Sequence, residues 1–91
     1  MLGQTKEASV IELEEILINE HQIVLYNDDV NTFDYVIDLL VKVCDHDPIQ
    51  AEQCAYLVHY KGKCVVKKGA FNILKVMHET LSNKGLTVEV E

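Results

Sequence analysis

The stretch Ile23-Val24-Leu25-Tyr26-Asn27-Asp28-Asp29 runs from four apolar or aromatic residues directly into three residues that favour turns. This pattern is typical of a short buried strand that ends at a turn, because Asn and Asp side chains hydrogen-bond the nearby backbone. A second apolar segment ends in Val58-His59-Tyr60-Lys61-Gly62-Lys63. Either stretch alone is common, and a lone histidine is more often structural. Together they bring an amide, carboxylates and an imidazole next to apolar residues, which suits a small cationic group attached to an apolar one.

Two helices are predicted between these stretches. The first follows Asn31, which we expect to be its N-cap. The second begins at Asp47-Pro48-Ile49-Gln50. Asp at the N-cap, Pro at the first helical position and Gln at the third all indicate the start of a helix. Gly62 suits the position after this helix, where a positive φ is needed. The inward-facing residues expected from helical spacing are Phe33, Val36, Ile37, Leu40, Val43 and Cys44 in the first helix and Ala51, Cys54, Ala55 and Val58 in the second.

The C-terminal part predicts a strand, a helix and a strand. Residues 63–67 form the first strand, and Lys68-Gly69 turns the chain into a third helix that Gly85 closes. From Leu86 to Glu91 apolar and polar residues alternate without a break, which is the pattern of a half-buried strand. The element order is therefore β-α-α-β-α-β. The residues of the third helix expected to face inward are Ala70, Ile73, Leu74, Met77 and Leu81.

The N-terminal residues stand apart from the rest of the chain. We expect residues 1–21 to be a flexible extension and residues 22–91 to be a single domain. Residues 1–8 are predicted to be a disordered tail, whereas Ser9-Val10-Ile11-Glu12 matches a helix capping box. The segment after the tail is either a short helix or an arm that orders only on a partner, and a frayed terminus is an equal alternative.

Composition narrows the class of partner. The 91 residues carry a formal net charge of −7, which would repel a phosphate backbone or an anionic membrane, so we expect neither nucleic acid nor membrane as a partner. A positively charged ligand or a basic protein surface fits better. No apolar run approaches the roughly 18 residues of a spanning helix, and the start of the chain lacks the plan of a signal peptide. We therefore expect a cytoplasmic protein.

Metal binding and catalysis are both disfavoured. Cysteines and histidines that invite a zinc interpretation are present, but no C-x-x-C pair occurs, and zinc fingers depend on closely spaced ligand pairs. An odd number of cysteines in apolar segments is typical of buried thiols in a reducing compartment. A Cys–His hydrolase would need an activated thiolate, a base and a cleft. We therefore expect no cofactor and no enzyme. The residues considered are Cys44, His46, Cys54, His59 and Cys64.

Four segments share the motifs of one known family. They are Leu25-Tyr26-Asn27-Asp28-Asp29, Thr32-Phe33-Asp34-Tyr35-Val36, Ala51-Glu52-Gln53 and Val58-His59-Tyr60-Lys61-Gly62-Lys63. In this combination they closely resemble the ClpS family, adaptors that carry N-end-rule substrates to a Clp AAA+ unfoldase and its peptidase. The likeness is good over residues 22–66 and looser beyond. It implies an α/β fold of the α+β sandwich type, in which a three-stranded antiparallel sheet packs against three helices.

The resemblance also implies a pocket for the first residue of a polypeptide. Asn27, Asp28 and His59 would bind the α-ammonium, whose three N–H donors need three acceptors. The expected guests are N-terminal Leu, Phe, Tyr or Trp. The expected partner is the N-domain of a ClpA- or ClpC-like unfoldase. The rival interpretation is a pocket-less interaction domain that regulates a Clp ATPase by occupying its N-domain. The positions that match the family's apolar side-chain pocket are Phe33, Ala55, Val58 and Leu86.

Two features depart from the family pattern. Phe33 and Ala55 stand where the family usually has Met, so a rigid ring replaces a flexible thioether at one position and a side chain is shortened at the other. The stretch between residues 66 and 70 is also shorter than in the family. An acid and a lysine that the family uses against the unfoldase near the start of the third helix have no sure counterpart here.

Overall fold

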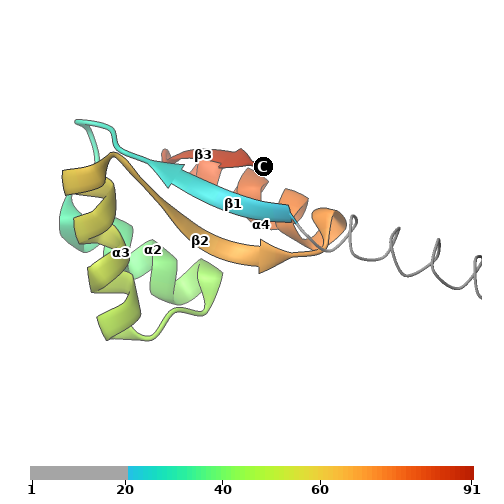
Figure 1. Ribbon diagram of the computed structural model, residues 1–91, viewed down its shortest axis with the longest axis horizontal. Coiled ribbons are helices and arrows are strands. Elements are labelled where there is room, and N and C mark those ends of the chain that lie inside the picture. Colours follow the sequence, from blue (N-terminus) through green and yellow to red (C-terminus); the bar gives the residue numbers. More distant parts are fainter. Residues whose placement is uncertain (1–20) are drawn as a thin grey trace, which may run out of the picture.

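The computed structural model describes residues 21–91, which form strands and helices in the predicted order β-α-α-β-α-β (Figure 1). The predicted tail and capping box lie within residues 1–20, outside the described residues. The sequence assigned His21 to this extension, whereas it is the first residue of the first strand. The elements are β1 (His21–Tyr26), α2 (Phe33–Cys44), α3 (Pro48–Lys61), β2 (Lys63–Gly69), α4 (Phe71–Asn83) and β3 (Thr87–Val90).

The three strands form an antiparallel sheet with β1 in the centre, as the family resemblance implied. Leu25 pairs with Cys64 of β2 on one side and with Val88 of β3 on the other. Ile23 and Leu25 are fully buried, because alternate residues of a strand point to the same face and this face packs on a helix. The strand that leads into the Asn-Asp-Asp turn is therefore the centre of the fold.

The strand β2 is longer than the sequence predicted. It continues beyond Lys67 to Gly69, since Lys68 and Gly69 pair with Gln22 and His21 of β1. The sequence pattern treated Lys68-Gly69 as a turn because glycine and exposed lysine are poor strand formers. Pairing with the neighbouring strand outweighs that local preference.

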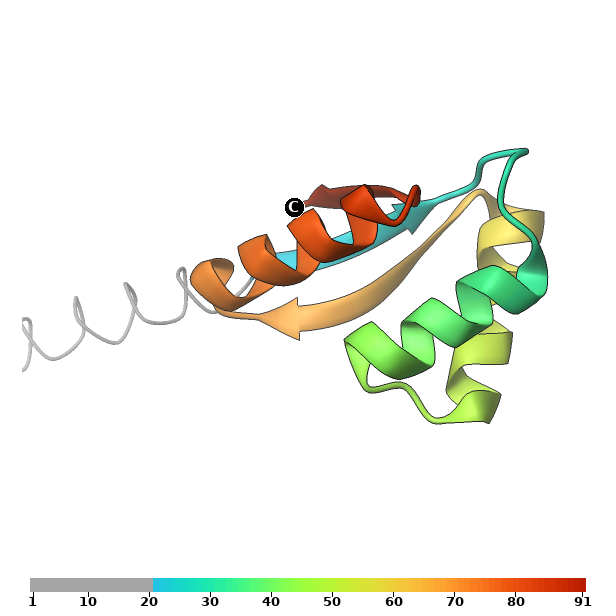
Figure 2. The ribbon, with the colours of Figure 1, turned by 180° about the vertical axis from the view of Figure 1, so that it is seen from behind.

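The helices occupy two places around the sheet. Helix α4 lies along one face, whereas α2 and α3 pack against each other beside the end where β1 finishes and β2 begins (Figures 1 and 2). The turn after β1 thus faces the α2–α3 pair, and the candidate site lies at this juncture. None of the helices within residues 21–91 is long and apolar enough to cross a membrane.

The predicted inward faces are confirmed for α3 and only partly for α4. All four residues predicted for α3 are buried. In α4, Leu74 and Leu81 are buried, but Ile73 is 61% exposed, so its predicted inward position is wrong. Leu74 and Leu81 are seven residues, about two helical turns, apart and mark the side of α4 that faces the sheet. Ile73 precedes Leu74 by one residue, so its side chain is rotated by about 100° around the helix axis from that side.

The ends of α3 follow the sequence, but the start of α2 does not. The Asp47 carboxylate accepts a hydrogen bond from the backbone N–H of Gln50 at 2.8 Å, and Gly62 ends α3 with φ of 94°. Helix α2 is capped by Thr32, whose hydroxyl accepts from the Tyr35 N–H at 3.2 Å. The predicted N-cap, Asn31, is one residue too early, because its side chain has other partners.

The three cysteines are free thiols that lie in or beside the core. Cys44 and Cys54 are buried, as expected, whereas Cys64 is only half-buried. Burial raises the pKa of the Cys44 thiol to about 11 and also raises the pKa of Cys54, which has Cys64 beside it. Cys44 and Cys54 therefore stay protonated at neutral pH. No group of three or more His, Cys, Asp or Glu side chains within residues 21–91 is placed to hold a metal ion.

Candidate functional site

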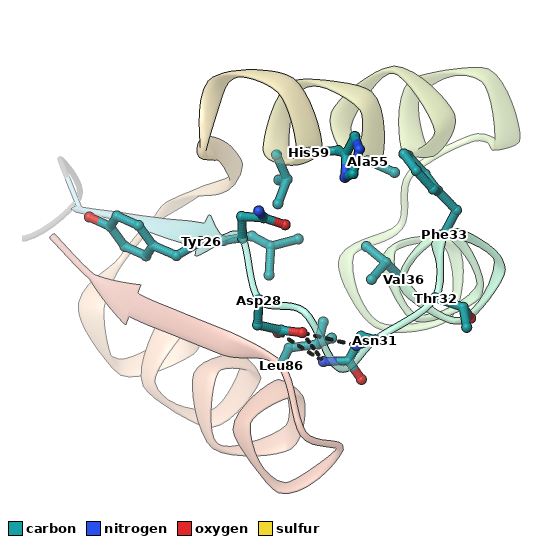
Figure 3. A pocket seen from close by; sticks show the side chains of 12 residues that line it. Tyr26, Asp28, Asn31, Thr32, Phe33, Val36, Ala55, His59 and Leu86 are labelled. Carbon is teal, nitrogen blue, oxygen red and sulfur yellow. Dashed lines mark hydrogen bonds between the residues drawn. The ribbon is translucent and has the colours of Figure 1, made fainter.

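A hollow opens between the end of β1, the start of α2, the inner face of α3 and the loop before β3 (Figure 3). Counted together with the part open to solvent, its empty space is about 400 Å³. All seven residues that the sequence analysis assigned to the site line it. The lining residues are Leu25, Tyr26, Asn27, Asp28, Asn31, Thr32, Phe33, Val36, Ala55, Val58, His59 and Leu86.

Asp28 gives the hollow a fixed negative charge. Its Oδ1 accepts hydrogen bonds from the backbone N–H groups of Val30 and Asn31 at 3.0 and 2.9 Å and from the Asn31 side-chain amide at 3.1 Å. Its Oδ2 accepts from the same amide at 2.9 Å and from the Thr87 hydroxyl at 3.5 Å. Partial burial favours the protonated acid, but the hydrogen bonds from Asn31, Val30 and Thr87 outweigh burial and hold the pKa of Asp28 below its usual value. The side chain is therefore an anion at neutral pH.

Asn31 closes one side of the hollow. Its side-chain amide donates to both oxygens of Asp28 and also to the carbonyl of Gly85 at 2.9 Å. One turn into α2, the Tyr35 hydroxyl donates to the carbonyl of Lys84 at 2.5 Å. These bonds, which we call the loop seam, tie the turn after β1 to the loop that precedes Leu86. This role of Asn31 was not predicted from the sequence, although the bond from the Val30 N–H to Asp28 is a common turn pattern.

Asn27 and His59 approach the hollow from two other elements. The Asn27 backbone N–H donates to the Gly62 carbonyl at 2.9 Å, which fixes the end of β1 against the end of α3. His59 projects from the last turn of α3, across the hollow from Asp28 (Figure 3). Within residues 21–91, no hydrogen bond occupies the imidazole of His59 or the side-chain amide of Asn27. Both side chains are therefore available to a ligand.

The remaining wall is apolar. Ala55, Val58 and Leu86 are buried and present hydrocarbon to the hollow, and Phe33 stands at its edge with 36% of its surface exposed. The Phe33 ring lies 5.2 Å from the His59 ring between centroids. The sequence analysis missed Leu25 and Val36 as lining residues, because periodicity assigned both to the core and does not show where a core borders a cavity. The site thus combines a polar rim, which includes Asn27, Asp28 and His59, with a hydrocarbon interior.

Comparisons with known proteins converge on one family. The family described as "ATP-dependent Clp protease adaptor protein ClpS" matches residues 18–89. ATP-dependent Clp protease adapter proteins ClpS from Salmonella gallinarum and from Escherichia coli O1:K1 are each 38% identical over 45 residues, which is 50% of this chain and 42% of theirs. The matched region thus spans less than half the length of these relatives.

A solved structure shows the same fold. Agrobacterium tumefaciens ClpS2, bound to L-phenylalaninamide, superposes with a TM-score of 0.77 over 81% of this chain and 96% of that one. The two sequences are 19% identical. At this identity the likeness shows the fold, and the chemistry of the site has to be argued from the residues present in this chain.

Proposed function

Because the chain belongs to the ClpS family, we propose that it is an adaptor that binds the N-terminal residue of substrate polypeptides and delivers them to a Clp AAA+ unfoldase for degradation. The observation that carries the proposal is the hollow itself. It combines the Asp28 anion and two unengaged polar side chains with an apolar interior. Such a site matches a free α-ammonium attached to an apolar side chain.

The polar rim supplies acceptors for an ammonium group. Its three N–H donors would be met by the Asn27 side-chain oxygen, the Asp28 carboxylate and a neutral ring nitrogen of His59. Of the two carboxylate oxygens of Asp28, Oδ2 has more capacity to accept a further hydrogen bond. Oδ1 already accepts three hydrogen bonds, whereas Oδ2 accepts two, one of which is long at 3.5 Å. An acetylated or internal residue would leave these acceptors without partners.

The apolar wall selects the first side chain. Phe33, Ala55, Val58 and Leu86 would surround N-terminal Leu, Phe, Tyr or Trp and bury its surface from water. A charged first residue would lose its hydration without gaining a partner. Phe33 has few rotamers compared with the Met usual in the family, so the edge of this pocket adapts less to the shape of its guest.

Calorimetric titration tests the proposal. A Phe-initiated peptide with a free α-amine should bind, and the same peptide with an acetylated α-amine should not. A Val-initiated peptide serves as the control for side-chain shape and should bind more weakly than the Phe peptide. Equal affinity for the free and acetylated peptides would rule out amine recognition.

The second half of the function is docking on an unfoldase, for which we propose the N-domain of a ClpA- or ClpC-like ATPase in the cytoplasm as the partner. Helix α4 starts at Phe71, directly after β2 ends at Gly69, and its first turn contains no acidic residue. The family's acidic contact residue thus has no counterpart there, and docking in this chain would use other side chains. A pocket-less regulator of the ATPase, the alternative, is disfavoured by the formed hollow and its unengaged polar side chains.

A further inference from the structure

A row of aromatic rings leads from the hollow onto the outer surface of α3. His59 and Phe33 line the hollow, and the ring of Phe33 lies 5.2 Å from that of Tyr56. Tyr56 in turn stacks on Tyr60 with a centroid distance of 6.1 Å and an angle of 8° between the rings. His59 meets Tyr60 edge-on at 4.8 Å. The apolar lining of the pocket is therefore continuous with the aromatic surface outside it.

This surface is unusually open for aromatic residues. Tyr56, Leu57 and Tyr60, which we call the aromatic ledge, are 48%, 47% and 72% exposed. They border a shallow groove whose other walls are Gln53 and Lys61, so no carboxylate among residues 21–91 lines it. Large aromatic side chains left exposed side by side next to a pocket are typical of recognition surfaces, because they offer contact area at a low cost in conformational entropy.

The opposite side of the hollow has a different character. There the loop seam joins Asp28, Asn31 and Gly85 by hydrogen bonds, so the rim is polar and its groups are already engaged. A substrate has to continue past the rim after its first residue enters the pocket. The α3 side offers apolar contact to the second and third residues of the substrate, and the seam side offers little.

We infer that the aromatic ledge binds the side chain of the third residue of the substrate and favours an apolar or aromatic residue there. In an extended peptide, side chains two residues apart point to the same side and are about 7 Å apart. The ring of Tyr56 lies 5.2 Å from that of Phe33 at the pocket edge, and the ring of Tyr60 lies 6.1 Å further on, so the ledge begins within one such repeat of the pocket edge. Lys61 beside the groove disfavours Lys or Arg at this position. The inference rests on the proposed binding of the first residue in the pocket.

Three peptides with a free α-amine test this subsite. They begin Phe-Gly-Gly, Phe-Gly-Tyr and Phe-Tyr-Gly and are otherwise identical. The Phe-Gly-Tyr peptide should bind about three- to tenfold more tightly than the Phe-Gly-Gly peptide, the range expected for one aromatic contact. The Phe-Tyr-Gly peptide should gain less, because the second side chain points away from the ledge.

Variants of the ledge show where any gain arises. In the Tyr56→Ser/Tyr60→Ser protein the Phe-Gly-Tyr advantage should disappear, while the affinity for Phe-Gly-Gly stays within about twofold of the parent. Tyr60→Ser alone removes one of the two rings and should lose part of the advantage. Ile49→Ser is the matched control, because Ile49 is a 70% exposed apolar residue at the other end of α3.

The outcomes separate the ledge from the pocket. If the parent protein fails to bind even the Phe-Gly-Gly peptide, the proposed function fails and the ledge with it. If the Phe-Gly-Gly peptide binds but a third-position Tyr adds nothing, the ledge inference alone is overturned. A third-position advantage that survives in the Tyr56→Ser/Tyr60→Ser protein overturns it as well.

Discussion

The two polar sides of the pocket differ in how their groups are held. On the loop side, the Asp28 carboxylate accepts hydrogen bonds from Val30, Asn31 and Thr87, and the loop seam anchors it to Gly85. On the α3 side, the imidazole of His59 is exposed, and no described residue forms a hydrogen bond with it. In the proposed function, the loop side would therefore serve both the fold and the ligand, whereas the α3 side would serve the ligand. This difference predicts which substitutions affect stability as well as binding.

The largest effect is expected from Asp28→Ala. It should weaken binding of a Leu- or Phe-initiated peptide by about 2–5 kcal/mol, because the desolvated ammonium would lose its charged partner. It should also lower the thermal midpoint, since Val30 and Asn31 lose their acceptor. Calorimetry and thermal unfolding measure the two effects. Asp29→Ala, at the exposed neighbouring position, is the control and should change neither. A variant that binds normally would show that Asp28 is only a turn residue.

His59→Ala should separate binding from stability. We expect a loss of about 1–3 kcal/mol in peptide affinity, the cost of leaving a buried donor unpaired, with no change in the thermal midpoint. Glu52→Ala, also exposed on α3 but outside both the hollow and the groove beside the aromatic ledge, is the matched control. The contrast between the two walls collapses if His59→Ala lowers stability as much as Asp28→Ala does.

The pH dependence of stability measures what the Asp28 carboxylate, on the loop side, contributes to the fold. The pKa of Asp28 is lower in the folded protein than in the unfolded chain, so the unfolded chain binds the proton more readily. Asp28 therefore stabilises the fold above its usual pKa of 3.8, and this contribution is lost as the pH falls through the lowered pKa. Asp28→Asn should show a flatter stability profile below about pH 4 than the parent protein. Parallel profiles of denaturant midpoint against pH would contradict this.

The smallest change in affinity is expected from deleting residues 1–20. Every proposed binding residue lies between Asn27 and Leu86, so peptide affinity should stay within about twofold. We nevertheless expect slower degradation of an N-degron reporter by the cognate Clp protease, because the sequence predicts a flexible extension there and an unfoldase engages loose chain ends. Both measurements are made on the same truncated protein. Lost peptide binding would make the segment part of the pocket, and undiminished degradation would make it dispensable for delivery.

Local signals in the sequence were sufficient for much of this structure. Both ends of α3 could be predicted from local signals. Asp47, Pro48 and Gln50 lie within the first turn and mark the start of the helix, and Gly62 readily adopts the positive φ that ends it. The residues that line the site could be predicted because the family motifs include residues from both polar sides of the pocket. That they bind an ammonium stays a prediction.

What could not be predicted depends on contacts between distant residues. Asn31 resembles an N-cap locally, but its side chain bonds the Gly85 carbonyl 54 positions away, and Thr32 caps the helix instead. Ile73 matches a helical stripe, yet the rotation of α4 on the sheet leaves it exposed. The ring row from Phe33 to Tyr60 was likewise missed, because it joins α2 to the outer face of α3.

The position of β2 at one edge of the sheet has a consequence for the proposed function, in which the protein would work beside unfolded chains. A free strand edge is a template on which an extended polypeptide can pair and aggregate. β2 carries Lys63, Lys67 and Lys68 within seven residues, and the opposite edge strand, β3, is only four residues long. Lysines and short strands both discourage such pairing. In the proposed function, the protein would thus hold a substrate by its first residues while its sheet edges resist pairing with the rest of the substrate chain.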